Sequence, residues 1–443
     1  MAKWSRPLRG PRATGTMIST SALAISPLHW MALGTFVVGV QGFMLPALLP
    51  DLAADLSVSV VTAGQLVTVF TLSYAISSPI LTAITGELAR RKLLIVSMTA
   101  FALANFFACV ATSYWTLLWA RVFLAFAAGL YMPNASALAG AVVEPARRGK
   151  ALATVTAGTT VAVALGVPLS AVIGHTFGWR LTFAIVGILA LLATIGFAFG
   201  LARDLGSDVP ATTFVERVGV VRRKFVVVAL LDTKFWASGT YNIYTYLAVF
   251  LSQQAGIEGS HIGMVLFVWG ASAAVGVTTG GVLTDRLGAR TAVVASLVLL
   301  AFAYLSFSLF AYTMEPDSAR IPILVAVALW GFANWAFFPA QQARLIGLSG
   351  NRLASIVISL NASLMFIGYS LGATIGSITM AHGSPAALGW VAALSEFSSL
   401  LLVFIATKNG EGRAERTAAL EETASTGQVR GRAGVRFAQE DIP

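Results

Sequence analysis

The chain has 443 residues, of which 57% belong to the hydrophobic set and only 11% are charged, and its mean hydropathy is +0.80. Soluble globular proteins are about 45–50% apolar and about 25% charged. This composition therefore excludes a soluble enzyme, a disordered protein and a nucleic-acid binder, despite the net charge of +10.

Cysteine and histidine give no sign of a metal or redox centre. The single cysteine, Cys109, excludes a disulfide framework and a cysteine-based metal or cluster site. The four histidines, His29, His175, His261 and His382, fall at predicted helix ends or loops without metal-ligand spacing. A Walker-type phosphate loop and a G-x-S-x-G elbow are also missing from the sequence, so we expect no cofactor, no metal and no enzymatic activity.

Apolar stretches long enough to cross a bilayer recur along the chain. They cover residues 29–50, 61–83, 93–113, 116–140, 151–174, 181–202, 225–252, 261–284, 291–312, 321–341, 353–379 and 387–407. The alternating pattern of a transmembrane barrel is missing, and helices satisfy their own backbone groups in lipid. The sequence therefore predicts an all-α membrane protein with twelve transmembrane helices.

The positions of the basic residues predict the orientation of the chain. An even number of spans puts both termini on one side of the membrane. On the opposite side the connections hold only Arg180 and Arg320, and the spans hold only Arg121 and Lys234. Every other Lys and Arg falls on the side of the termini, which the positive-inside rule makes cytoplasmic. We therefore expect a multi-pass protein of the inner membrane, whose basic charge meets anionic lipid rather than nucleic acid.

Changes in composition divide the chain into five parts. Residues 1–28 are basic and residues 408–443 are polar, so we expect a cytoplasmic tail at each end, with Met17 as an alternative to Met1 as the start. The longest internal connection, 203–224, is the expected linker between one bundle at 29–202 and another at 225–407.

The two predicted bundles resemble each other in sequence. A shift of 206 residues places Pro133 on Pro339 and Gly166 on Gly372. Internal repeats are common in transporters, whose substrate sites lie near the midplane between the repeats. The repeat predicts two pseudo-symmetric bundles of six helices each.

The most distinctive local motif follows span 8. It reads Gly281-Val-Leu-Thr-Asp285-Arg286-Leu-Gly288-Ala-Arg290. A carboxylate at a helix end can accept bonds from the next helix and pair with arginine, while glycines permit a tight turn. Such a group can join two helices and separate during a conformational change. An ordinary charged turn is the alternative.

Further short motifs follow one another in a fixed order. Span 4 begins Leu117-Leu-Trp-Ala-Arg121, and span 5 contains Gly166-Val-Pro168. Span 10 contains Trp330-Gly followed by Pro339-Ala-Gln-Gln-Ala-Arg344. Together with the loop after span 8, these motifs resemble the major facilitator superfamily, and within it the twelve-span drug:proton antiporters and their sugar-efflux relatives.

The resemblance implies a monomer in which two six-helix bundles give alternating access to a small-molecule substrate. The signature at Gly166 and Pro168 is associated with export, and Arg121 matches an arginine thought to assist proton exchange. Many relatives carry an acid in span 1 where this chain has Gln41, which cannot titrate. Either the proton site has moved, with Asp232 as the first candidate, or the coupling differs.

Four charged residues lie within predicted spans: Arg121, Asp232, Lys234 and Glu396. A charge at mid-bilayer costs about 2.5–3.5 kcal/mol on insertion scales. Arg121, Asp232 and Glu396 are therefore candidates for ion coupling. The alternatives are that Arg121 snorkels to the interface, that Asp232 and Lys234 mark the edge of span 7, and that Glu396 has a structural partner.

Small residues recur at four-residue spacing in spans 5, 11 and 8, a pattern that allows helices to approach closely. They are Gly158, Ala162, Gly166, Ser170 and Gly174, then Gly368, Gly372 and Gly376, and Gly276 and Gly280. The resemblance places these helices at the seam between the bundles. Packing inside one bundle is the alternative.

The helices expected to face the central cavity carry aromatic and amide groups. The candidates are Gln41, Met44, Tyr131, Asn134, Tyr241, Asn242, Tyr244, Thr245, Trp330, Asn334, Trp335, Asn361 and Met365. Apolar walls with a few polar groups suit a neutral or weakly charged amphiphile. We therefore expect an exporter of a small organic solute in exchange for protons. The alternatives are an ion-independent facilitator and a substrate-binding membrane sensor.

Overall fold

The structure, a computed structural model, describes residues 26–86, 88–144, 147–201, 223–350 and 353–408. Most of the two predicted tails and of the linker at 203–224 lies outside the described residues. The regular elements of the described part are all helical. In chain order they are α1 Pro27–Phe43, α2 Leu45–Asp55, α3 Val60–Ile84, α4 Arg90–Cys109, α5 Tyr114–Ala141, α6 Arg148–Val161, η2 Ala162–Gly166, α7 Val167–Phe177, α8 Trp179–Gly200, α10 Lys224–Thr245, α11 Leu247–Ala255, α12 His261–Leu287, α13 Ala289–Thr313, α14 Pro316–Ser349, α15 Ala354–His382, η4 Pro385–Ala387 and α16 Leu388–Lys408.

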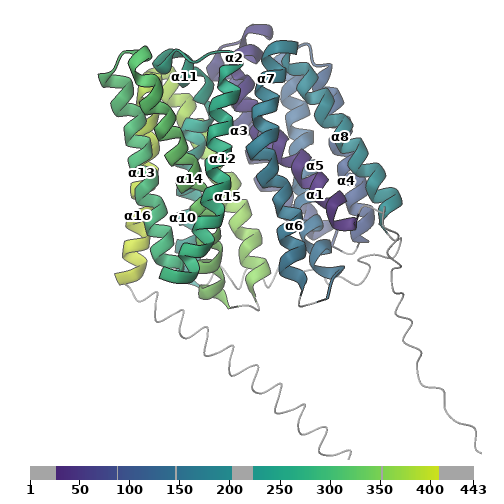
Figure 1. The fold of residues 1–443 in the computed structure, drawn as a ribbon. Helices are drawn as coiled ribbons and strands as arrows, with labels where there is room; N and C mark the ends of the chain where they lie inside the picture. Colours follow the sequence, from purple (N-terminus) through teal and green to yellow (C-terminus); the bar gives the residue numbers. More distant parts are fainter. Residues whose placement is uncertain (1–25, 87, 145–146, 202–222, 351–352, 409–443) are drawn as a thin grey trace, which may run out of the picture.

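The helices form two bundles that stand side by side with their axes roughly parallel (Figure 1). The N-terminal bundle contains α1 to α8, drawn purple to teal, and the C-terminal bundle contains α10 to α16, drawn green to yellow. We call the end at which α10 begins and α16 finishes the terminal face, and the opposite end the far face.

The helices have the dimensions and composition of membrane spans. Ten helices of the described part are long and apolar enough to cross a membrane, and the bent pair of α1 and α2 makes an eleventh span. α10 is as long as these, but it carries Lys224, Asp232 and Lys234, and it packs against α15 and α16. Counted with α11, it takes the place of the predicted seventh span. The predicted all-α membrane fold in two bundles is confirmed.

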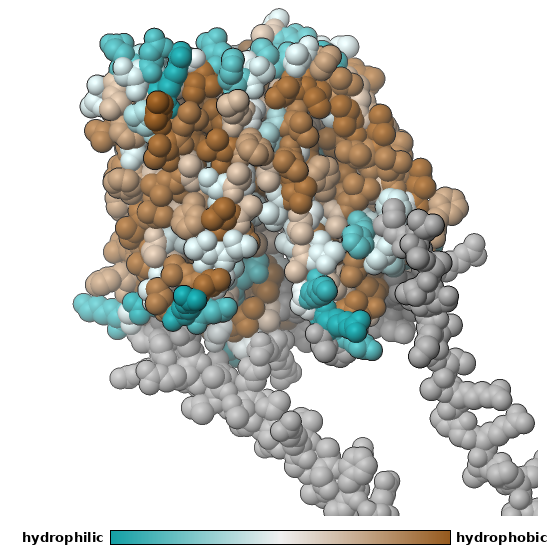
Figure 2. Space-filling model, viewed as in Figure 1, coloured by the Kyte–Doolittle hydropathy of each residue, from teal (hydrophilic) through white to brown (hydrophobic). Residues whose placement is uncertain are grey.

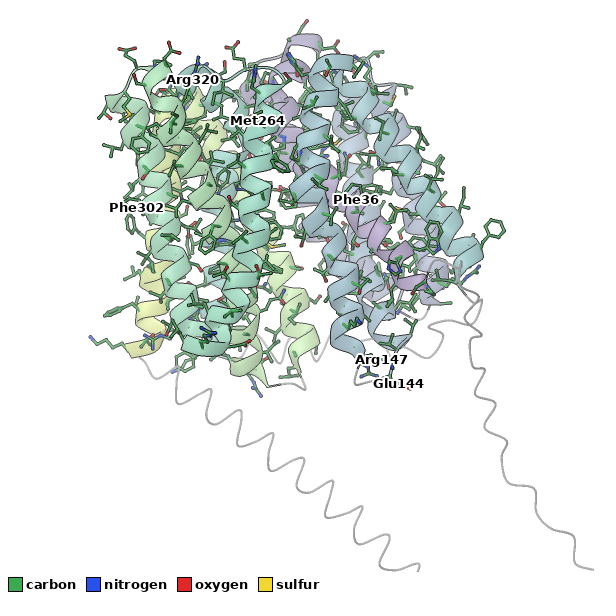
Figure 3. All side chains as sticks on the ribbon, in the orientation of Figure 1. Phe36, Glu144, Arg147, Met264, Phe302 and Arg320 are labelled. Carbon is green, nitrogen blue, oxygen red and sulfur yellow. The ribbon has the colours of Figure 1, made fainter. Side chains whose placement is uncertain are left out.

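Apolar side chains cover the outer surface between the two faces (Figure 2). Met264 on α12 and Phe302 on α13 are 67% and 62% exposed and point away from the bundle (Figure 3). Charged side chains gather at the ends, with Arg320 at the far face and Glu144 and Arg147 at the terminal face (Figure 3). Such a large exposed apolar surface is suited to lipid rather than water.

The small-residue stripes pack helices of the same bundle against each other. A Cβ on Gly158 of α6 would overlap the carbonyl oxygen of Ala32 on α1. In the other bundle, a Cβ on Gly372 of α15 would overlap the carbonyl oxygen of Ser238 on α10. The helices lie at the seam as expected, but these small residues face their own bundle. The alternative, close packing inside one bundle, describes them correctly.

The helices that carry the stripes nevertheless meet the other bundle with their remaining faces. A Cβ on Gly270 of α12 would lie 2.6 Å from the carbonyl oxygen of Val163, within the π-helical turn η2 of the N-terminal bundle. α3 and α15 meet where Gln65 donates a hydrogen bond to Ser377 at 2.7 Å.

The contacts between the bundles run from the far face to about the middle of the molecule. Farther from the far face, α3 contacts α15 where the rings of Tyr74 and Phe366 stack with their centroids 3.7 Å apart. Toward the terminal face the surface is indented between the two bundles (Figure 2). The protein is therefore closed at its far face and open toward its terminal face.

Candidate functional site

A broken first span brings the N-terminal bundle to the centre of the interface. α1 and α2 meet at Met44 with a bend of 52°. The break follows from Pro46, which has no N–H to donate to the carbonyl of Gly42, four residues earlier. The N–H of Ala47 bonds to Met44 at 3.2 Å. The carbonyls of Gly42 and Phe43 are thus left for other donors.

Two tyrosines of the C-terminal bundle supply those donors. The Tyr244 hydroxyl donates to the carbonyl of Phe43 at 2.8 Å, and the Tyr241 hydroxyl donates to the carbonyl of Gly42 at 3.2 Å. Both tyrosines lie near the end of α10, which breaks at Tyr246 before α11. Discontinuous helices at matching positions of two repeats are typical of transporter binding sites.

Arg121 lies beside the same break. Its side chain is fully buried on α5, its Nη1 donates to the carbonyl of Gln41 at 3.3 Å and its Nε to that of Leu66 at 3.3 Å. The guanidinium lies over the Phe70 ring, 4.0 Å from its centroid. In the described part of the chain no carboxylate pairs with it. Arg121 therefore does not snorkel, and its positive charge belongs to the interior.

Two buried amide side chains have no hydrogen-bond partner among the described residues. They are Gln41 on α1 and Asn242 on α10, and both amide oxygens and both amide nitrogens are buried. Buried polar groups are hydrogen-bonded in most proteins, so an unpaired buried amide needs an explanation. A ligand that accepts and donates hydrogen bonds would satisfy both groups.

Other predicted cavity residues serve the interior of the C-terminal bundle. Asn334 accepts a hydrogen bond from Thr240 at 2.6 Å, and Asn361 accepts one from Thr233 at 2.6 Å. Thr245 bonds back to the carbonyl of Tyr241 at 2.5 Å. Trp330 is buried against other aromatic rings, with Trp269 at 5.4 Å, and Met365 packs partly buried against the core.

Two predicted cavity residues of α5 have partners inside the N-terminal bundle. The Tyr131 hydroxyl donates to the carbonyl of Met31 at 2.8 Å, and its ring stacks on Phe197. Asn134 accepts a hydrogen bond from Arg90 at 2.7 Å. The structure thus groups Gln41, Met44, Tyr241, Tyr244 and Trp335 near the break in span 1, with Asn242 next to Tyr241 in the chain, and assigns Tyr131 and Asn134 to other contacts.

Asp232 is part of a buried ion pair. Its carboxylate pairs with Nη1 of Arg344, both side chains are fully buried, and Ser399 donates to it at 3.0 Å. Arg344 lies inside α14, which continues to Ser349, so the prediction that it stands in a connection after span 10 is wrong. The pair lies near the start of α10 and the end of α14, so Asp232 is buried inside the bundle and its charge is compensated. Lys234 is partly exposed, with its Nζ 5.5 Å from the centroid of Phe235.

Glu396 is the second buried acid of the C-terminal bundle. It is fully buried on α16, and its two carboxylate oxygens have no hydrogen-bond partner within the described residues. Gly239 on α10 makes room for it, because a Cβ there would lie 2.5 Å from Oε1 of Glu396. A structural partner for Glu396, the alternative considered from the sequence, is not found in the described part.

The predicted conformational gate lies at the terminal face. Gly288 lies between α12 and α13 with φ +85°, a conformation that favours glycine. Asp285, Arg286 and Arg290 are exposed, and within the described residues Asp285 makes no ion pair. Gly281 has open space where a Cβ would stand. This arrangement fits a gate whose partners are apart while the terminal face is open.

The other two predicted gate residues lie where η2 joins α7 in span 5. A Cβ on Gly166 would overlap Val40 on α1, so this glycine lets α1 approach. The carbonyl oxygen of Pro168 faces Gly263 of α12 across the seam, 3.0 Å from where a Cβ on that glycine would stand.

Three aromatic residues of the interface, Phe43, Trp269 and Tyr369, were not among the predicted cavity residues. The ring of Phe43 lies 6.5 Å from each of the other two. Pro46, which follows Gly42 at the spacing that breaks a helical hydrogen bond, is the signal in the sequence that could have located them.

Comparison with known proteins gives a consistent family. A family model described as the Major Facilitator Superfamily matches residues 31–238 and 233–436. The uncharacterized MFS-type transporter YbcL of Bacillus subtilis is 31% identical over 380 residues, which cover 85% of this chain and 95% of that protein. A chloramphenicol resistance protein of Streptomyces lividans is 32% identical over 276 residues, covering 62% of this chain and 70% of the relative.

A solved structure supports the fold. The crystal structure of a bacterial homolog of the human lysosomal transporter Spinster, in an inward-facing and unoccupied conformation, has a TM-score of 0.67 at 18% identity. The match covers 89% of this chain and 97% of that chain. The chain therefore belongs to the major facilitator superfamily of membrane transporters.

Proposed function

We propose that this transporter exports a small, neutral or weakly charged organic solute by alternating access, in exchange for protons. The observation that carries the proposal is the composition of the closed interface. Gln41 and Asn242, which neighbour the bonded residues Gly42 and Tyr241 in sequence, have buried amide groups without a partner among the described residues, and Arg121 donates to the carbonyl of Gln41. A strongly anionic solute would need several inward arginines, and a cationic solute would need an acid.

The direction of transport and the first solute to test come from similarity. One relative is named as a chloramphenicol resistance protein, and resistance by a transporter is achieved by export. Gly166 and Pro168 carry the span 5 signature that the resemblance associates with export. In this proposal a monomer lies in the inner membrane, and its terminal face is cytoplasmic. Chloramphenicol, a neutral amphiphile, is therefore the first solute to test.

Glu396 is the proposed proton carrier. Asp232 was the first candidate from the sequence, but its charge is compensated by Arg344. The carboxylate of Glu396 has no such compensation among the described residues, and a bare charge inside a bundle is costly. Proton uptake would remove that charge and proton release would restore it, so protonation of Glu396 can change the stability of the C-terminal bundle.

An ion-independent facilitator is the second candidate. It is favoured by Gln41, which stands where many relatives carry an acid and which cannot bind or release a proton in the physiological range. The two candidates differ in one measurable property, the response of solute flux to a pH gradient.

Flux of labelled chloramphenicol through proteoliposomes with an imposed pH gradient tests the proposal. We expect the gradient to drive accumulation in the wild type, and Glu396→Gln to abolish accumulation while exchange at equal pH continues. Glu258→Gln is the matched control, because Glu258 lies in an exposed loop where it accepts a hydrogen bond from Ser252. A wild type that ignores the gradient supports the facilitator. If Glu396→Gln accumulates solute like Glu258→Gln, Glu396 is not the proton carrier.

A further inference from the structure

One aromatic side chain of the N-terminal bundle is surrounded by aromatic rings of the C-terminal bundle. Five rings have their centroids 6.0 to 6.5 Å from that of Phe43. We call these five residues the aromatic box: Tyr241, Tyr244, Trp269, Trp335 and Tyr369. They come from α10, α12, α14 and α15, so four helices of one bundle enclose one side chain of the other.

The contact between Phe43 and the aromatic box joins the two bundles. Phe43 stands at the end of α1, in the bundle that moves relative to the box during alternating access. The tyrosines of the box bond to the carbonyls of Gly42 and Phe43, which the break at Pro46 leaves available. When the far face opens, the ring and its two carbonyls must leave the box together.

The aromatic box keeps hydrogen-bond donors that Phe43 does not use. The indole N–H groups of Trp269 and Trp335 are buried, and within the described residues neither has a hydrogen-bond partner. Phe43 and Trp335 are partly exposed, whereas the other four rings are buried. The occupied box thus has an accessible side and unsatisfied donors, as expected of a binding site rather than of a closed core.

We infer that the aromatic box is a substrate site, and that Phe43 with its neighbouring carbonyls occupies it in place of a neutral solute that carries an aromatic ring next to a carbonyl group. The box offers ring faces and edges to the aromatic ring, and two tyrosine hydroxyls to the carbonyl oxygen. A solute that enters from the terminal face displaces Phe43 and takes over the hydroxyls. Its binding therefore removes contacts that hold the far face closed.

This inference rests on the proposed function for its role in transport, but binding can be measured without flux. The probe is N-acetyl-L-phenylalaninamide, which reproduces the ring and the two carbonyls of the Phe43 segment without charge. Its affinity is measured by calorimetric titration of the purified transporter in detergent. The comparison compounds are the cyclohexylalanine analogue, which lacks the aromatic ring, and 2-phenylethanol, which lacks the carbonyls.

We expect Phe43→Ala to bind the probe about tenfold more tightly than the wild type, because the competing ring has been removed. Phe43→Leu keeps an apolar side chain at this position, so its affinity for the probe should lie between those of the wild type and Phe43→Ala. Phe123→Ala is the matched control, since Phe123 is 52% exposed on the outer surface of α5, and it should bind like the wild type. Each comparison compound should bind Phe43→Ala about 2- to 10-fold more weakly than the probe does.

Several results would overturn the inference. One is a Phe43→Ala or Phe43→Leu protein that melts cooperatively and gains no affinity. Equal affinity for the probe and its cyclohexyl analogue would show that the site is only an apolar cavity. An equal gain in probe affinity in Phe123→Ala would show that the probe partitions into the detergent. Probe binding without chloramphenicol flux would support the aromatic box as a binding site and contradict the proposed function. Chloramphenicol flux without probe binding would support the proposed function and contradict the aromatic box as a substrate site.

Discussion

The two tyrosine hydroxyls that reach across to span 1 should determine how firmly the far face is closed. Tyr241→Phe together with Tyr244→Phe removes the hydroxyl donors to Gly42 and Phe43 and keeps both rings. A net hydrogen bond contributes about 1 kcal/mol, so the two together contribute about 2 kcal/mol to the closed conformation. The ratio of open to closed far face should therefore rise by roughly 30-fold.

Distances between spin labels measure this ratio. After Cys109→Ser, one label pair replaces Val110 and Met314, which are 68% and 40% exposed in the far-face connections of the two bundles. A second pair replaces Leu88 and Leu287, which are exposed at the terminal face. In the double tyrosine variant we expect the distance distribution of the far-face label pair to include a population at longer distance. The distribution of the terminal-face label pair should include one at shorter distance.

Tyr131→Phe is the matched control for that experiment. Its hydroxyl makes a bond of the same kind at 2.8 Å, but to Met31 inside the N-terminal bundle. The variant should lose a comparable amount of stability without changing either distance distribution. Unchanged distances in the double variant, or an equal change in Tyr131→Phe, would refute the role of Tyr241 and Tyr244 at the seam.

Three further predictions concern single positions. Gly372→Ala should lower the melting temperature, because a Cβ there would overlap the carbonyl of Ser238 and overpacking costs about 1–3 kcal/mol. Gly347→Ala, with open space at the Cβ position, should leave the melting temperature unchanged or raise it, and equal losses in both would contradict the close approach of α15 and α10. Asp232→Asn should destabilise the bundle by about 3–5 kcal/mol, as in other broken buried pairs, and denaturant unfolding that matches the wild type would show that the pair with Arg344 contributes nothing. Asp285→Asn should lower flux about fivefold without changing the melting temperature of the protein in this conformation, and full flux would remove Asp285 from the gate.

The spans and their division into two bundles could be predicted because they depend on local composition. Each predicted apolar stretch corresponds to one helix or to two or three consecutive helical segments of the structure. Ends of helices were less predictable where polar residues are buried. The positive charge of Arg344 by itself indicates a connection outside the span. In the structure the buried carboxylate of Asp232 compensates that charge, and α14 continues through Arg344 to Ser349.

The arrangement of the site depended on contacts that no local pattern records. The glycines of span 5 and span 11 have a spacing that predicts close packing, but the spacing does not say which helix they approach. Tyr131 and Tyr244 look alike as aromatic residues near a helix centre, yet one bonds inside its own bundle and the other across the seam. Phe43 escaped notice because its importance comes from rings nearly 200 or more residues later in the chain.

Cross-linking the bundles across the far face tests alternating access most directly. Gln65 and Ser377, which form a hydrogen bond between α3 and α15, are replaced by cysteine in a Cys109→Ser background and joined by a short bifunctional thiol reagent. We predict that the link stops chloramphenicol flux in proteoliposomes and that a linker cleaved by reductant restores it. Undiminished flux through fully linked protein would contradict the account.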